Sequence, residues 1–319
     1  MIIFTKSKVN SALTVIRGAY CGYHRMSKSR NVDATNFLIA FLIPVIIAAA
    51  SPLAATTSSD TDYFKSVRKQ LIDDGFNAEK IQQLYSRPQV SFEADGVTIF
   101  FTYSEARLDY DQFTNDWSIR KAKKFMDQYQ VELDQAQQKY GVDSRIITAI
   151  LLVETGLGTT VGTRSALNTL STLASLSNRK VRSEFWKIVT DKQKISRKKF
   201  EKRADQKSKW AYRELKAFLT YAYREGLDPT EVQGSIAGAI GYAQFMPSNI
   251  IAYGKDGDND GRVDLLTHAD AMASIANFLR SHGWRPGISR KKAEKVIYYY
   301  NHSTYYVDTI LKIANRLES

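Results

Sequence analysis

The sequence predicts a mainly α-helical protein with a minor β element. After residue 60, apolar residues recur at helical spacing in most segments, and glycines separate these segments. A single short stretch is rich in β-branched and aromatic residues. With 44% hydrophobic and 24% charged residues, the 319-residue chain has a globular composition. It is long enough for one large domain or two moderate ones.

Residues 1–55 are typical of a secretory signal peptide. Six basic residues precede the apolar run Phe37–Ala50, and small residues follow it. Met26 is an alternative start that gives a shorter basic region. An uncleaved membrane anchor is the other interpretation, but a spanning helix needs about 20 apolar residues. We therefore expect export to the periplasm, with a membrane association only if this segment is retained. Cys21, the single cysteine, would leave with it, which excludes disulfides and cysteine-based metal sites.

The first elements after the signal are two helical segments with a β segment between them. Apolar spacing predicts a helix over Asp60–Arg87, interrupted at Gly75, and a long polar helix over Ile119–Tyr140. Between them, Val90–Tyr103 surrounds an Asp-Gly pair with β-forming residues, which predicts a hairpin. We assign residues 56–140 to an N-terminal helical region that packs on a catalytic region of residues 141–319.

The catalytic region is predicted to be helical throughout. Ser144–Glu154 is almost continuously apolar, so this helix should be buried nearly all round. Further helices are expected at Ser165–Leu176, Trp210–Glu225, Ala269–His282 and Lys291–Leu317.

The net charge of +12 is concentrated in two places. Part belongs to the signal segment, and most of the remainder belongs to residues 179–209, an insertion with 13 basic and four acidic residues. Nucleic-acid binding would require base-reading groups beside this block, and the sequence shows only a solvated lysine-rich helix or loop. We therefore exclude nucleic acid as a partner.

Glu154 is a candidate general acid. It ends the most apolar predicted helix, and Gly156 and Gly158 stop that helix directly afterwards. Partial burial and the negative end of the helix dipole both favour the protonated carboxyl group. The alternative is a structural glutamate that bonds nearby backbone or an arginine.

Three further motifs stand out. Gly234–Ser248 is rich in small residues that allow close approach to a helix or a ligand, but it lacks the lysine and spacing of a phosphate-binding loop. We predict no organic cofactor. Asp256–Asp264 has the carboxylate and glycine spacing of an EF-hand, with Thr267 at the usual glutamate position, and predicts a structural calcium site rather than a solvated turn. Tyr298–Tyr306 gathers aromatic and amide side chains that suit either a sugar site or a core.

In their shared order, these motifs resemble the lytic murein transglycosylase B family, lysozyme-like enzymes that cleave peptidoglycan. The resemblance covers residues 60–315. It is carried by Tyr140-Gly141-Val142, Val153-Glu154-Thr155, Gly234-Ser235, Gln244-Phe245-Met246-Pro247-Ser248, the Asp loop, Ser281-His282-Gly283-Trp284 and Tyr300-Asn301.

The resemblance implies a lysozyme-like helical domain, an additional helical domain and a single catalytic acid/base, Glu154. It implies glycan contacts from Ser235, Gln244, Tyr300, Asn301 and Tyr306. It implies calcium ligands from Asp256, Asp258, Asp260, the carbonyl of Arg262, and Asp270 in a lengthened loop.

The implied reaction cleaves the β-1,4 bond between N-acetylmuramic acid and N-acetylglucosamine and leaves 1,6-anhydromuramyl ends. A lysozyme-type hydrolase and a non-catalytic peptidoglycan-binding protein remain as alternatives. Glycan strands, and complexes with other cell-wall enzymes, are the expected partners. Three departures from the family pattern are Gly156-Leu157, Phe278 and the long basic block. We expect this block to be mobile and to attract the anionic polymer.

Overall fold

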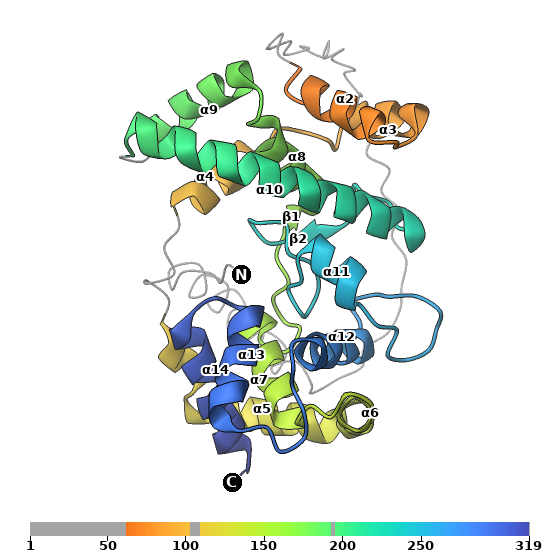
Figure 1. The fold of residues 1–319 in the computed structure, drawn as a ribbon, viewed down its shortest axis with the longest axis vertical. Coiled ribbons are helices and arrows are strands. Elements are labelled where there is room, and N and C mark those ends of the chain that lie inside the picture. Colours follow the sequence, from red (N-terminus) through yellow and green to blue (C-terminus); the bar gives the residue numbers. More distant parts are fainter. Residues whose placement is uncertain (1–61, 103–108, 193–194, 319) are drawn as a thin grey trace, which may run out of the picture. The chain divides into compact units, whose positions relative to one another are not determined.

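The described part of the chain is almost entirely helical (Figure 1). The computed structural model describes residues 62–102, 109–192 and 195–318, so the predicted signal peptide lies outside it. None of the helices in these ranges combines the length and apolar character needed to cross a membrane. The helices are α2 (Lys65–Asp73), α3 (Ala78–Tyr85), α4 (Ala94–Thr102), η2 (Tyr110–Phe113), α5 (Asp116–Gln128), α6 (Gln130–Tyr140), α7 (Ser144–Thr155), α8 (Ala166–Ser175), α9 (Arg179–Lys192), α10 (Arg197–Arg224), α11 (Pro247–Tyr253), α12 (His268–Ser281), α13 (Arg290–Tyr300) and α14 (Thr304–Glu318).

The predicted hairpin at Val90–Tyr103 is wrong, because this segment contains the helix α4. Glu93 Oε1 accepts a hydrogen bond from the Gly96 N–H at 2.9 Å and forms an ion pair with Arg164 at 2.6 Å. Val97 and Phe101, one helical turn apart, are both buried. These tertiary contacts outweigh the β preference of the individual residues.

The β element lies elsewhere and is very small. Strands β1 (Arg164–Ser165) and β2 (Gln233–Gly234) pair antiparallel, with Arg164 opposite Gly234. Two isolated bridges continue from Gly234 to Ile240 and from Ile240 to Phe245. The glycine-rich segment is therefore a compact folded loop rather than a helix.

Each of the long predicted helices is divided in two. Gly75, with φ of 95°, separates α2 from α3, as the sequence predicts. The backbone of Tyr129, with φ of −115° and ψ of 31°, leaves helical geometry and ends α5 before α6 begins. Asn301 adopts an extended conformation that ends α13 before α14.

Helix α7 is the buried centre of one group of helices. Every residue from Ile146 to Thr155 is buried, which confirms the prediction for this segment. Helices α5, α6, α12 and α14 pack against α7. Helices that precede α7 in the sequence and helices that follow it therefore both pack against it.

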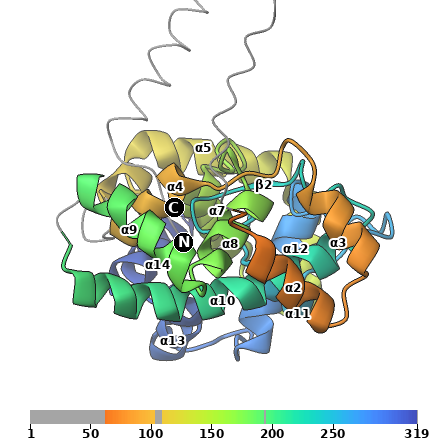
Figure 2. The ribbon, with the colours of Figure 1, turned by 90° about the horizontal axis from the view of Figure 1, so that it is seen from above.

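The long helix α10 organises the second group of helices. It packs along α8 and α11, and Figure 2 shows it from above. The predicted helix Trp210–Glu225 forms only its C-terminal half. Within the basic segment, residues 179–192 form α9 and residues 197–209 form the N-terminal half of α10, so these parts are helical; the mobility of the segment stays a prediction.

Candidate active site

Glu154 lies at the C-terminal end of α7 and is only 7% exposed. The helix stops at Gly156, which has φ of 58° and donates its N–H to the Leu152 carbonyl at 3.0 Å. Glycine adopts this left-handed conformation without the steric cost that a β-carbon adds. The apolar helix thus holds one carboxyl group at its end, as the sequence predicts.

A buried tyrosine bonds this carboxyl group. Tyr306 of α14 donates its hydroxyl proton to Glu154 Oε1 at 2.8 Å, and the tyrosine side chain is fully buried. The Tyr300 ring lies parallel to that of Tyr306, with centroids 6.3 Å apart. The Tyr300 hydroxyl donates to the Ala243 carbonyl at 2.6 Å. Tyr300 and Tyr306 therefore tie the last two helices to Glu154 and to the glycine-rich segment.

Both tyrosines remain protonated at physiological pH. Burial raises the pKa of Tyr300 and of Tyr306 well above the usual value, and the nearby charge of Glu154 raises each pKa further. The Tyr306 hydroxyl is therefore a permanent donor to Oε1. Glu154 Oε1 therefore acts as an acceptor in this contact.

Thr155 connects the end of α7 to the glycine-rich segment. Its hydroxyl donates to the Tyr242 carbonyl at 3.1 Å and accepts from the Gly158 N–H at 3.0 Å. Close approach is essential here, because a β-carbon on Gly241 would lie 2.4 Å from the Leu265 Cβ. A β-carbon on Gly238 would likewise lie 2.8 Å from the Leu170 Cγ of α8, so the predicted close approach to a helix is confirmed.

A lysine from α5 caps the same helix end. Lys121 Nζ donates to the Gly156 carbonyl at 2.8 Å, where a cation interacts favourably with the helix dipole. Burial lowers the pKa of Lys121. The sequence motifs gave no role to Thr155, although it lies in the Val-Glu-Thr motif. They also missed Lys121, which precedes Gly156 by 35 residues and has no local sequence signal.

His268 supports the turn that follows Glu154. In the tautomer that carries its proton on Nε2, this nitrogen donates to the Leu157 carbonyl at 3.3 Å. Leu157 has φ of 64°, an unfavourable conformation for a branched side chain. The imidazole packs between Tyr129 and Tyr242, with centroid distances of 4.4 and 4.5 Å. The sequence indicated no role for this histidine.

The other predicted glycan contacts shape the loop around the site. The Ser235 hydroxyl accepts from the N–H groups of Ala237 and Ala239 at 3.2 and 3.1 Å. Gln244, with φ of 47°, donates its side-chain amide to the Gly241 carbonyl at 2.9 Å. Asn301 is largely buried at the end of α13. Contact of these residues with a glycan stays a prediction.

Three of the predicted calcium ligands lie together. Carboxylate oxygens of Asp256, Asp258 and Asp260 lie within 4.8 Å of one another. Asp270 is only 1% exposed and is not part of this cluster. Its two oxygens accept from the N–H groups of Gly257 at 2.7 Å and Asp264 at 2.6 Å, so it closes the two ends of the loop. The three clustered carboxylates are hard oxygen donors of the kind that calcium prefers.

The fold and the site define a helical, lysozyme-like domain with one glutamate at the end of a buried helix. Residues 59–293 match the Transglycosylase SLT domain family, and the chain belongs to this family.

The chain is 34% identical over 176 residues to the membrane-bound lytic murein transglycosylase B of Escherichia coli (strain K12), a match that covers 55% of this chain and 41% of that protein. The chain therefore spans less than half the length of this curated relative.

Two solved structures share the fold. The E. coli lytic transglycosylase SLT35 in complex with calcium has a TM-score of 0.64 at 22% identity, covering 81% of this chain and 93% of that chain. The structure of SltB3 from Pseudomonas aeruginosa in complex with NAG-NAM-pentapeptide has a TM-score of 0.63 at 18% identity, covering 81% and 79% of the two chains. These matches confirm the predicted mainly helical, lysozyme-like fold.

Proposed function

We propose that this protein is a peptidoglycan lytic transglycosylase that uses Glu154 as its single acid/base. The observation that carries the proposal is the bond from Tyr306 to Glu154, because it combines a buried carboxyl group with a fixed neutral donor. Membership of the Transglycosylase SLT domain family supports the same chemistry. The substrate bond is the β-1,4 linkage between N-acetylmuramic acid and N-acetylglucosamine.

The reaction proceeds by two proton transfers through one carboxyl group. Glu154 first donates its proton to the glycosidic oxygen as the bond from that oxygen to C1 of the muramyl residue breaks. The ionised carboxylate then takes the proton from the muramyl 6-hydroxyl, whose oxygen bonds to C1. The product carries a 1,6-anhydro end, no water is consumed, and Glu154 is protonated again.

A single carboxylate suits this mechanism. Glycosidases usually need two carboxyl groups that face each other across the bond. The other residues to which the family resemblance assigns glycan contacts, Ser235, Gln244, Tyr300, Asn301 and Tyr306, are all neutral. A nucleophile supplied by the sugar removes the need for a second carboxylate.

Around this carboxylate, we assign glycan contacts to Ser235, Gln244, Tyr300, Asn301 and Tyr306. Tyr300 and Tyr306 also position Glu154 through their packing and hydrogen bonds. Ser235 and Gln244 hold the glycine-rich segment in its folded form. Substrate contacts from these residues would come from a backbone that these hydrogen bonds already hold.

A calcium ion would have a structural role. Asp256, Asp258 and Asp260 would hold it, together with the carbonyl of Arg262, while Asp270 fixes the loop ends. A bound ion would relieve the repulsion among the clustered carboxylates. No carboxylate of this cluster is needed for the proton transfers at Glu154.

For the rest of the chain, we propose a periplasmic enzyme whose signal segment, residues 1–55, is removed on export. If that segment is retained, it anchors the enzyme to the membrane. Residues 56–140 are assigned to a region that supports a catalytic region of residues 141–319.

Product analysis of purified peptidoglycan tests the proposal. The wild-type protein should release anhydromuramyl products, which are one water lighter than the products of hydrolysis. Glu154→Gln should fold normally and release none. Glu79→Gln is the control for the glutamate-to-glutamine change, because Glu79 is exposed on α3 and takes no part in the site; it should still cleave. Reducing ends would indicate a hydrolase, and no product from the wild type would indicate a binding protein.

A further inference from the structure

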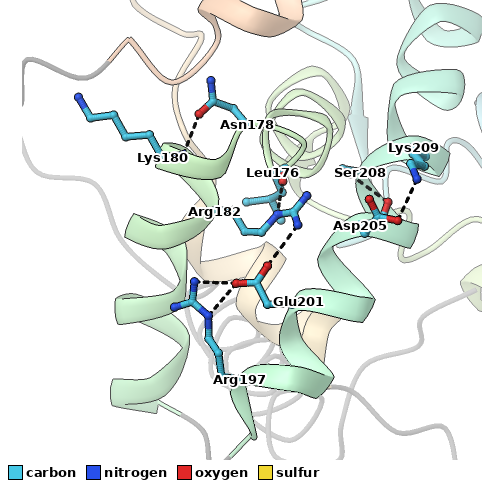
Figure 3. A network of polar contacts seen from close by, with 9 residues as sticks. All are labelled: Leu176, Asn178, Lys180, Arg182, Arg197, Glu201, Asp205, Ser208 and Lys209. Atoms are coloured by element: carbon cyan, nitrogen blue, oxygen red, sulfur yellow. Dashed lines mark hydrogen bonds and ion pairs between the residues drawn. The ribbon is translucent and has the colours of Figure 1, made fainter.

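The basic segment of residues 179–209 carries fewer available charges than its composition suggests. Figure 3 shows the polar network that neutralises part of it. Glu201 forms ion pairs with Arg182 at 3.2 Å and with Arg197 at 2.6 Å. Asp205 pairs with Lys209 at 2.9 Å.

Two more basic residues serve the packing of α10 against α4. Arg203 donates to the Phe101 carbonyl at 2.7 Å. Lys207 Nζ lies 3.4 Å from the centre of the Phe100 ring, and burial lowers the pKa of this lysine to about 8. Neither side chain is a freely solvated charge.

Six cations remain exposed and form no ion pair with any residue that the structure describes. We call them the basic surface: Arg179, Lys180 and Lys187 on α9, and Lys198, Lys199 and Lys202 on α10.

Helical geometry directs the basic surface away from the core. The buried residues Val181, Phe185 and Val189 form one stripe of α9, and Phe200, Ala204 and Ser208 form one stripe of α10. At 3.6 residues per turn, all six cations lie about 100° or more around the helix axes from these stripes. The rings of Phe101, Phe185 and Phe200 lie 5.5 to 6.1 Å apart, so both buried stripes face α4 and the cations face outward.

The same helix that carries half of this surface also supports the site. Near its middle, α10 presents Glu214, which accepts from the N–H and hydroxyl groups of Ser248, the last residue of the glycine-rich segment. Lys199 precedes Glu214 by 15 residues, a distance of about 22 Å along a helix. A rigid element therefore separates the basic surface from the loop of the candidate site by a fixed length.

We propose that the basic surface is a second binding site for anionic peptidoglycan, which contacts carboxylates of the polymer outside the catalytic site. This inference rests on the proposed function for the identity of the polymer. A single exposed ion pair contributes little. A polymer with repeated carboxylates binds several cations at once. After its first carboxylate has bound, each further contact forms within the same complex, which raises the overall affinity. An outward-facing surface suits such a partner better than it suits a small molecule.

The experiment neutralises three of these lysines in the Glu154→Gln background, so that the polymer is not degraded. Lys198→Gln/Lys199→Gln/Lys202→Gln is compared with Lys291→Gln/Lys292→Gln/Lys295→Gln on α13. The control removes the same charge at the same spacing from exposed positions. Binding to purified sacculi is measured by co-sedimentation at low and high NaCl concentration.

We expect the variant of the basic surface to bind sacculi about fivefold more weakly at about 50 mM NaCl, and less than twofold more weakly at about 500 mM, because exposed charges are screened. The α13 control should change less than twofold. Sacculi whose carboxylates have been amidated should bind both triple variants alike. Unchanged binding, or an equal loss in the control, would overturn the proposal.

Two further measurements distinguish a peptidoglycan-binding surface from a lipid-binding surface and from a part of the catalytic site. If the Lys198/Lys199/Lys202 triple variant lost affinity for phosphatidylglycerol vesicles but not for sacculi, the basic surface would be a lipid-binding site and the proposal would fail.

In the background with an intact Glu154, the same triple substitution should leave the cleavage rate of short soluble glycan fragments unchanged. A reduced rate would show that these lysines contribute to catalysis instead. If the wild type cleaved nothing, the proposed function would fail while the binding comparison still stood.

Discussion

Replacement of Tyr306 by phenylalanine tests the central contact of the site. The substitution removes a single hydroxyl group and keeps the buried ring that packs beside Tyr300. Glu154 Oε1 then loses the donor that lies 2.8 Å away. The change is confined to one hydrogen bond, so its effect can be calculated.

The expected effect depends on the ionisation of Glu154. A hydrogen bond to a charged group contributes about 1.5–3 kcal/mol, more than a neutral one does. Loss of the bond therefore penalises the ionised carboxylate more than the protonated acid. We expect the free energy of unfolding to fall by about 2 kcal/mol where Glu154 is ionised and by less where it is protonated. For the same reason, the pH–rate profile for cleavage should move toward higher pH.

A double-mutant cycle measures this contact directly. Urea denaturation of the wild type, Tyr306→Phe, Glu154→Leu and the double variant gives the coupling energy between the two residues, because leucine has no acceptor for the Tyr306 hydroxyl. Tyr300→Phe is the matched control, since its hydroxyl donates to Ala243 and should show little coupling with Glu154. A coupling below about 0.5 kcal/mol, or a pH–rate profile that does not move, would refute the assigned role of Tyr306.

Three other changes have defined outcomes. Lys207→Met should raise the free energy of unfolding by about 1 kcal/mol at pH 7, because burial disfavours the lysine charge and the Phe100 ring offsets only part of this cost. Urea denaturation at increasing pH should show that this gain disappears near pH 10.4, where the lysine of the unfolded chain also loses its proton. Chelation of calcium should lower Tm by about 5 °C or more in the wild type and have no effect on Asp258→Asn. Thr155→Val should lower the free energy of unfolding by about 1–3 kcal/mol and slow cleavage, because the Tyr242 carbonyl loses its donor.

Each of these three predictions would be contradicted by a specific result. A gain from Lys207→Met that persisted at high pH would indicate a packing effect. A chelator response retained in Asp258→Asn would place the ion elsewhere. Wild-type stability and rate in Thr155→Val would show that this hydroxyl does not position the end of α7.

Helix α7 was predictable because all of its determinants are local. A continuous apolar run, an acidic residue near its end and Gly156 two residues later specify a buried helix that stops at Thr155, one residue after Glu154. The same reasoning predicted the clustered aspartates, since their spacing along a short loop already brings Asp256, Asp258 and Asp260 together. Family resemblance added Tyr306 to the list of site residues, but as a glycan contact rather than as the donor to Glu154.

The remaining features depend on contacts between distant segments. Val90–Tyr103 has the composition of a hairpin, and it becomes helical because Arg164 pairs with Glu93 and because its apolar residues are buried one turn apart. Lys121 and His268 reach the turn after Glu154 from helices that are 35 and 111 residues away in the sequence. No local pattern marks residues of this kind. The formal charge of the basic segment likewise gave no sign of which cations pack against α4.

The hydrogen bond between Glu154 and Tyr306 joins residues 152 positions apart. Contacts of such long sequence separation require a large loop to close, which makes them late and entropically costly steps of folding. Tyr306 thus reaches the carboxyl group of Glu154 only when the last helix docks. Any species in which α14 is detached, whether a folding intermediate or a proteolytic product, retains Glu154 but loses its bond with Tyr306. If Glu154 is the acid/base that we propose, activity depends on a docked α14, and loss of activity should precede global unfolding whenever α14 opens first.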